Sequence, residues 1–158
     1  MKRFMADRML GKLAKWLRVL GYDVIYLRKG TAEEIKRGLR QGRVLLTRDR
    51  RAQPWRREGR IVIVSSNDPQ EQLIEVFRNL ELQFSSSALF SRCLLCNRVL
   101  RAVDKNDIAA EVPEYVWHTH SRFFRCPQCN RVFWPGSHSV RMRRQLEQVL
   151  GSLNNAVS

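Results

Sequence analysis

Four cysteines in two Cys-x-x-Cys pairs place the strongest constraint on how this chain can fold. The pairs are Cys93–Cys96 and Cys126–Cys129, and 29 residues separate Cys96 from Cys126. Two residues between ligands let a tight turn present both thiolates to one ion, and two such turns complete a tetrahedron of sulfur atoms. We therefore expect one Zn²⁺ at these cysteines, in a ribbon-type module that runs from about Phe90 to His138.

Other uses of paired cysteines fit this pattern less well than zinc does. Two disulfides are disfavoured in an intracellular chain, and a thioredoxin-like redox pair usually occurs once, after a strand. Because the protein itself would fill all four positions, the zinc should be structural. Its binding energy would help to fold a module that has little hydrophobic core.

Upstream of the cysteines, the hydrophobic spacing alternates between strand and helix patterns. The expected strands are Arg3–Ala6, Val24–Leu27, Arg43–Thr47 and Ile61–Val64. The expected helices are Arg8–Leu20, Thr31–Gln41 and Pro69–Leu80, the first with Met9 on its apolar face. Alternation of this kind predicts an α/β fold, with a parallel sheet covered by helices. A basic loop is expected between the third and fourth strands.

The order of these segments predicts two modules and a tail. We expect an α/β domain at residues 1–84 and a serine-rich linker at residues 85–92. The zinc ribbon and its closing helix, Val140–Leu150, would occupy residues 93–150. Residues 151–158 should form a frayed tail.

Positive charge is concentrated in the first part of the chain. The net charge is +14, and residues 1–60 alone hold 18 Lys and Arg against 6 Asp and Glu. Such a field favours a polyanion, most often nucleic acid, over a merely solubilising surface. Anionic lipid is disfavoured because no long basic amphipathic helix carries aromatic anchors. An early acid at Asp7 argues against a secretory signal, so we expect a cytoplasmic protein without membrane spans.

Acidic residues follow the ends of several expected strands. Asp7, Asp49 and Asp68 would meet at the carboxyl edge of the sheet, where functional groups of parallel α/β folds gather. Carboxylates there suit Mg²⁺ or Mn²⁺, which could activate water against a phosphodiester. Basic residues nearby would hold the substrate backbone: Arg8, Lys12, Lys15, Arg48, Arg50 and Arg51.

Each acid also has a purely structural interpretation. Asp7 and Asp68 could cap the helices that follow them, and Glu34 could be a first-turn acid favoured by the helix dipole. Asp49 could balance the arginines beside it, although no helix pattern begins there. From patterns alone, the catalytic and structural interpretations of these acids carry equal weight.

Several segments, taken in order, resemble one ribonuclease family. They are Phe4–Arg18, Leu20–Asp23, Gly42–Arg50, Phe90–Cys93 with Cys96, and Cys126–His138. The family is the PIN-like domain found at the carboxyl end of a nematode mutator exonuclease and in stand-alone prokaryotic proteins. The resemblance implies a PIN-like three-layer α/β/α domain with a four-cysteine zinc ribbon, acting as a metal-dependent endoribonuclease on RNA such as tRNA or rRNA.

The resemblance places the acidic pocket at Asp7 and Asp49, with Asp68 and Glu34 as further candidates. Ala32 stands where relatives often have Asp, which leaves Glu33 or Glu34 as substitutes. Two alternative functions would use the same fold without cleaving RNA. One is a non-catalytic RNA- or ribosome-binding protein, and the other is a regulatory protein whose partner masks the pocket.

The three histidines and the aromatic residues of the ribbon remain open. His118 and His120 would share one face of an expected strand at Tyr115–His120, and His138 is expected to support the ribbon. Aromatic side chains between Trp117 and Trp134 alternate with arginines, a pattern that suits stacking on unpaired bases. Packing within the ribbon is the competing explanation.

Overall fold

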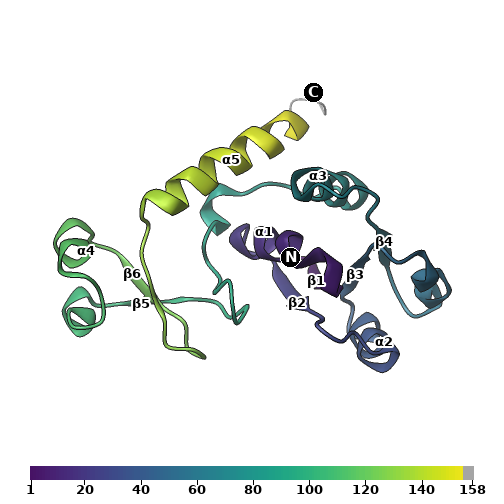
Figure 1. The fold of residues 1–158 in the computed structure, drawn as a ribbon, viewed down its shortest axis with the longest axis horizontal. Coiled ribbons are helices and arrows are strands. Elements are labelled where there is room, and N and C mark those ends of the chain that lie inside the picture. Colours follow the sequence, from purple (N-terminus) through teal and green to yellow (C-terminus); the bar gives the residue numbers. More distant parts are fainter. Residues whose placement is uncertain (155–158) are drawn as a thin grey trace.

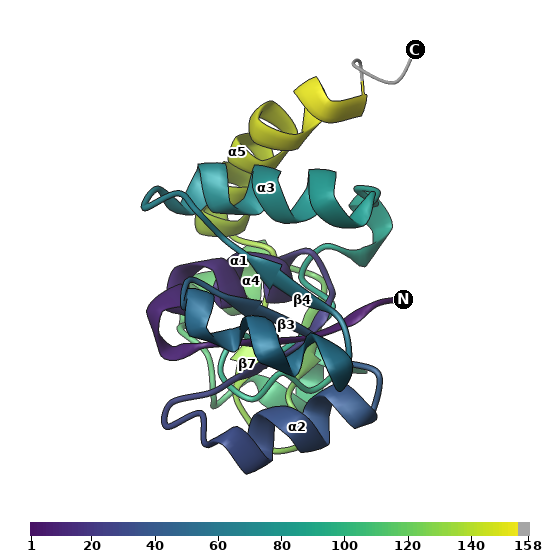
Figure 2. The ribbon, with the colours of Figure 1, turned by 90° about the vertical axis from the view of Figure 1, so that its right-hand side faces the viewer.

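In the computed structural model, which describes residues 1–154, helices cover both faces of a four-stranded parallel sheet (Figure 1). The strands are β1 (Arg3–Ala6), β2 (Asp23–Tyr26), β3 (Val44–Thr47) and β4 (Ile61–Ile63), in the order β2-β1-β3-β4. Helices α1 (Gly11–Val19) and α3 (Pro69–Leu80) lie on one side of the sheet and α2 (Ala32–Arg40) on the other (Figure 2). The expected α/β class with a parallel sheet is confirmed.

Successive residues of each strand point to opposite faces and so build two separate cores. Phe4 and Ala6 pack with α1 and α3, whereas Met5 between them packs with α2. All three side chains are buried, which is why the central strands are apolar without alternation. Gly38 of α2 lets the helix lie directly on Met5, because a Cβ at Gly38 would clash with the Met5 sulfur.

Local signals in the sequence set the ends of the helices. Thr31 and Glu34 form the expected capping box at the start of α2. Asp68 caps α3, whose first residue is Pro69. Gly21, at φ 89°, makes the turn from α1 into β2 and lies against the linker residue Ala88.

Two expectations about the basic segments are wrong. The first helix does not start at Arg8: Arg8–Leu10 forms a 3₁₀ helix, η1, and leaves Met9 62% exposed. The segment after β3 is not a loop but a second 3₁₀ helix, η2 (Arg50–Arg57), with Ala52 buried against the sheet. In both places an aspartate side chain accepts a hydrogen bond from the backbone and starts the turn.

The cysteine-containing module is a small antiparallel sheet with short helices. Its strands are β5 (Arg101–Val103), β6 (Phe123–Arg125) and β7 (Val132–Phe133). The 3₁₀ helix η4 (Lys105–Ile108) and helix α4 (Glu114–Thr119) complete the module. The strand expected at residues 115–120 is therefore wrong, because Pro113 starts helix α4 and Val116 packs into the module's core. His118 and His120 do not share a strand face.

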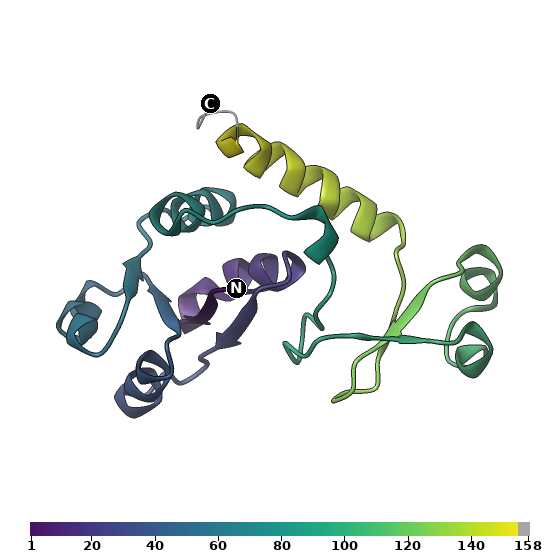
Figure 3. The ribbon, with the colours of Figure 1, turned by 180° about the vertical axis from the view of Figure 1, so that it is seen from behind.

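Helix α5 (Ser137–Asn154) extends further in both directions than the expected Val140–Leu150. Residues 151–154 of the expected frayed tail continue this helix, and residues 155–158 lie outside the described part. Met142, Leu146 and Leu150 pack into the same core as α1 and α3. Figure 3 shows α5 running from the cysteine-containing module back across the first domain.

A polar network joins the cysteine-containing module to the β2 edge of the main sheet. The Asp23 carboxylate accepts two hydrogen bonds from Arg43, at 2.8 and 3.0 Å, and one from Asn97 Nδ2 at 2.7 Å. Asn97 Oδ1 in turn accepts from Val24 N at 2.9 Å. The cysteine-containing module, which follows the 3₁₀ helix η3 (Ser86–Ala88) in the chain, thus covers one edge of the sheet. Within residues 1–154, no helix is both long and apolar enough to cross a membrane.

Candidate active site at the carboxyl edge of the sheet

Asp7 and Thr47 meet where the neighbouring strands β1 and β3 end. The Thr47 hydroxyl donates a hydrogen bond to Asp7 Oδ2 and accepts one from Asp49 N at 3.0 Å. Asp7 Oδ1 accepts from Met9 N at 2.9 Å. The 3%-exposed Thr47 therefore connects the two aspartates that sequence reasoning placed at this edge.

Asp49 lies at the start of η2 and is more open to solvent than Thr47. Its carboxylate accepts hydrogen bonds from Arg51 N at 2.9 Å and from the Arg51 guanidinium on both oxygens. The Arg51 side chain first, and its backbone N–H second, hold the pKa of Asp49 below its ordinary value. Asp49 is thus an anion at neutral pH, paired with a side chain that is 92% exposed.

A cleft of about 390 Å³ opens over these residues. Asp7, Thr47 and Asp49 line it from the strand ends. Lys29 from the segment after β2 and Trp55 from η2 also line it. The carboxylates therefore face a space that a substrate could enter, with a lysine and an indole beside them.

The other two acids of the expected catalytic set serve as caps. Both Gln70 N and Glu71 N donate to Asp68 Oδ1 at 3.0 Å. The Glu34 carboxylate accepts from Thr31 N at 3.1 Å within the capping box. Neither residue lines the cleft that contains Asp7 and Asp49.

The six basic residues expected to hold a polyanion take different positions. Arg8 and Arg51 line the acidic cleft, and Lys12 and Lys15 are exposed on α1. Arg48 is half-buried; its Nη2 lies 3.4 Å from Ser65 O, and its buried Nε has no hydrogen-bond partner within the described chain. The Arg48 backbone N–H donates to Asp7 Oδ2 at 3.2 Å, so this residue helps to position the Asp7 carboxylate.

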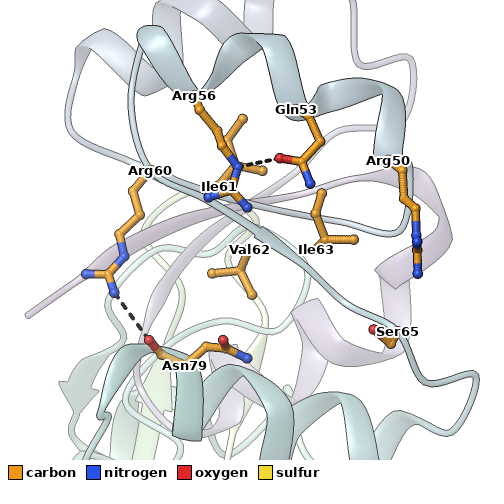
Figure 4. A pocket seen from close by; sticks show the side chains of 9 residues that line it. All are labelled: Arg50, Gln53, Arg56, Arg60, Ile61, Val62, Ile63, Ser65 and Asn79. Atoms are coloured by element: carbon orange, nitrogen blue, oxygen red, sulfur yellow. Dashed lines mark hydrogen bonds between the residues drawn. The ribbon is translucent and has the colours of Figure 1, made fainter.

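Arg50 lies on the opposite side of η2, in a separate basic groove of about 410 Å³ at the free edge of β4 (Figure 4). Arg56 and Arg60 line the same groove, where Arg56 Nε donates to Gln53 at 2.6 Å and Arg60 to Asn79 O at 3.2 Å. Helix η2 therefore separates an acidic cleft from a basic groove. The acidic cleft lies beyond the ends of β1, β2 and β3, whereas the groove lies along β4, and no residue of the cysteine-containing module lines either of them.

The donor set at the acidic cleft suits a hard cation. Two carboxylates can bind Mg²⁺ or Mn²⁺ when water and substrate phosphate complete the shell. The Asp7 carboxylate accepts hydrogen bonds from one hydroxyl and two backbone N–H groups, which hold it in place. The Arg51 guanidinium that pairs with Asp49 is exposed, so an incoming cation can displace it. Within residues 1–154, no group of three or more metal-ligating side chains gathers here.

The four cysteines form the one such group among the described residues, with their sulfur atoms within 4.8 Å of one another. The two turns are built alike: Asn97 N donates to Cys93 O at 2.9 Å, and Asn130 N donates to Cys126 O at 3.0 Å. Asn97 and Asn130 both adopt positive φ, at 62° and 59°. Burial raises the pKa of Cys93, whereas at Cys126 backbone donors outweigh burial and lower the pKa to about 7. The cluster is suited to a structural zinc ion.

Sequence reasoning missed three residues of the acidic cleft. Thr47 is the polar residue that ends an apolar strand just before Asp49, and that position is the signal by which it could be found. Lys29 and Trp55 reach the cleft from segments far apart in the sequence. Only the fold brings them to the strand ends.

Comparison with known families gives one match that covers most of the chain. The model of the family described as Mut7-C RNAse domain matches residues 2–146. The matched range begins just before β1 and ends within α5, so it includes both the acidic cleft and the four cysteines. No curated protein and no solved structure shows significant similarity to the chain.

Proposed function

The chain belongs to the Mut7-C RNAse domain family, and on this premise we propose that it is a metal-dependent ribonuclease with Asp7 and Asp49 as catalytic residues. The observation that carries the proposal is the Thr47 hydroxyl, which joins the two aspartates at the rim of a cleft. A carboxyl edge of a parallel sheet is where such folds bind their ligands. The surrounding positive charge favours a phosphodiester substrate.

Asp7 and Asp49 would hold Mg²⁺ or Mn²⁺ between them, with Thr47 fixing the orientation of Asp7. Such an ion supplies a polarised phosphoryl oxygen and an activated water. Arg51 has to release Asp49, and its guanidinium can then pair with a phosphate. Lys29 lines the same cleft, where its ammonium can stabilise charge that develops on the phosphoryl group.

The basic residues around the cleft would hold the RNA backbone. Arg51 bonds to the Asp49 carboxylate, and Arg8 lines the same cleft. Arg48 follows Thr47 at the end of β3, while Lys12, Lys15 and Arg50 extend the positive surface over α1 and η2. Contacts of this type carry affinity without sequence preference and weaken as salt rises. In the same proposal, Zn²⁺ at the cysteines is structural and takes no part in cleavage.

The deciding experiment measures cleavage of a single-stranded RNA by zinc-loaded protein with and without Mn²⁺. We expect cleavage only with the divalent ion, and a loss of about a hundredfold or more in Asp7→Asn and Asp49→Asn. Asp104→Asn is the matched control, because Asp104 also caps a short 3₁₀ helix but lies in the zinc module. Equal cleavage by Asp49→Asn and the wild type would refute the proposal.

A non-catalytic RNA-binding protein is the second candidate function. It is favoured by the small number of acids in the cleft, since Asp68 and Glu34 are engaged as caps and Ala32 provides no carboxylate. This candidate predicts RNA binding with a steep salt dependence and no cleavage with any divalent ion. The same assay separates the two functions.

A further inference from the structure

A second cleft, distant from the aspartates, lies between the linker, the zinc module and the start of α5. Its volume is about 680 Å³, within the usual range of ligand pockets. The walls come from residues 87–94, from α4, β6 and β7, and from residues 134–143. The cleft is therefore formed by the segment before the cysteines, the cysteine-containing module and α5 together.

Aromatic side chains make up much of the lining. Phe90, Phe124, Phe133 and Trp134 are half-buried, and Tyr115 is 71% exposed. Phe90 has φ 58°, a backbone conformation that is rare for a bulky residue, and its N–H bonds to Val19 O at the end of α1. Aromatic faces are thus available from the segment before the cysteines and from the cysteine-containing module itself.

The charged groups of this cleft are all basic. None of the described residues that line it carries a carboxylate. Arg92 is occupied by Gly21 O and Asn97 O, at 2.9 and 2.8 Å. The Arg122 guanidinium lies 5.9 Å from the centre of the Phe124 ring, and Arg143 is exposed on α5. Arg122 and Arg143 can therefore face an anion while the aromatic rings face something flat and apolar.

We propose that this cleft binds unpaired nucleotides of an RNA strand, with a base stacked against Phe124 and its phosphates near Arg122 and Arg143. A duplex cannot enter, because its bases are already stacked and paired. Every base has a π-face, so the site would accept single strands of any sequence. The inference rests on the proposed function for its ligand class, but it concerns a site that shares no lining residue with the cleft of Asp7 and Asp49.

Charge complementarity favours RNA over an apolar helix of a partner protein. Arg122 and Arg143 would attract carboxylates and phosphates equally, but the flat rings that line the same cleft match a base better than a helix. The net charge of +14 adds a long-range attraction for a strand of phosphates. If the cleft instead binds a partner helix, substitutions in it will leave RNA binding unchanged in the following experiment.

The test measures binding of a fluorescein-labelled single strand of about 12 nucleotides, a length typical of such sites. The protein is the zinc-loaded full chain without added divalent ion, so that cleavage does not interfere. We expect Phe124→Leu to weaken binding about fivefold or more, and to make no difference for a strand whose bases have been removed. Retained zinc content and an unchanged melting temperature show that the variant is folded.

Two neighbouring arginines allow a controlled test of the contribution of charge to binding. Arg143 lines the cleft and Arg144 does not, although both are exposed on α5. Both substitutions remove one positive charge, so they weaken the long-range attraction equally. Arg143→Ala should nevertheless weaken single-strand binding several-fold more than Arg144→Ala, because only Arg143 lines the cleft. Equal losses for the two variants, or equal affinity of Phe124→Leu and wild type for the intact strand, would overturn the proposal.

The two proposals fail in different ways. If Asp49→Asn cleaves as well as wild type while Phe124→Leu still discriminates intact from base-free RNA, only the catalytic assignment is lost. If cleavage depends on Asp49 but no variant of the cleft changes single-strand binding, the cleft is not a nucleotide site.

Discussion

The cysteine cluster and the acidic cleft are both candidate metal sites, and they are built in opposite ways. Four sulfur atoms lie within 4.8 Å of one another in turns that repeat the same backbone hydrogen bonds. At the cleft, the two aspartates follow different strands: the Thr47 hydroxyl bonds the Asp7 carboxylate and the Asp49 backbone N–H, and an exposed arginine pairs with the Asp49 carboxylate. A site whose ligands already satisfy the ion stabilises the fold, whereas a site left incomplete has room for substrate.

The largest effect should follow from disrupting the cysteine cluster. Cys126→Ser, or removal of zinc by a chelator, should unfold β5–β7, because zinc contributes about 10–16 kcal/mol in modules of this kind. Hydrogen exchange read by mass spectrometry should show lost protection at residues 101–133 and a smaller loss in β1–β4. Pro127→Ala, in the same turn, is the control. A protected ribbon in Cys126→Ser would mean that the cluster is not the structural centre of the module.

Next in size is the bridge within the cleft. Thr47→Val removes the hydroxyl that holds Asp7 and Asp49 together, which should lower metal-dependent cleavage by about 10- to 100-fold. Thr47→Ser keeps the hydroxyl and should restore most of the rate. If Val and Ser variants cleave alike, Thr47 contributes only packing.

A smaller effect is expected at the network that docks the two regions. Burial would raise the pKa of Asp23, but the hydrogen bonds from Arg43 and Asn97 outweigh it and hold that pKa below its ordinary value. The ionised Asp23 carboxylate therefore stabilises the fold fully above the unfolded-state pKa, about 3.9. This stabilisation is lost as the pH falls below that value toward the folded-state pKa. Asp23→Asn should cost about 1–3 kcal/mol near neutral pH by weakening hydrogen bonds to a charged group.

Denaturant unfolding at several pH values measures this effect. The difference between wild type and Asp23→Asn should shrink below pH of about 4. Glu114→Gln removes a carboxylate that is 91% exposed and serves as the control. A difference that persists unchanged in acid would show that the charge of Asp23 is not what holds the modules together.

The smallest effect should come from the exposed pair at the cleft. Arg51 lowers the pKa of Asp49, so Arg51→Ala should move the acidic limb of the pH–rate profile to higher pH. Arg40→Ala removes the same charge from α2 and should leave the limb in place. An unmoved limb in Arg51→Ala would mean that Asp49 does not set the acidic limb.

Features encoded by neighbouring residues could be predicted from the sequence. The capping box at Thr31, the cap and proline at Asp68 and Pro69, and the two cysteine turns each depend on a few consecutive residues. The placement of Asp7 and Asp49 at one edge of the sheet followed from the strand pattern, and the structure places both in one cleft. Their catalytic role stays a prediction.

Features set by packing between distant segments could not be predicted. The hydrophobic pattern did not predict the 3₁₀ helix η2 that begins after Asp49. The helix has no apolar repeat, because only Ala52 and Trp55 pack against the sheet. Tyr115–His120 alternates like a strand but is helical, since Pro113 and Val116 determine its start and its buried side. Asp23 has the pattern of a turn residue, and its partners Arg43 and Asn97 lie far along the chain.

Helix α5 has a consequence for the order in which the chain is made. Its Met142, Leu146 and Leu150 complete a core whose other members precede the cysteines. During synthesis the first domain would therefore emerge with an apolar surface uncovered, and the ribosome would have to translate the whole zinc module before the covering helix appeared. Metal loading of the nascent chain would then be a step in the maturation of the domain that carries Asp7 and Asp49. The two regions would then be assembled as one unit, even though their chemistry is separate.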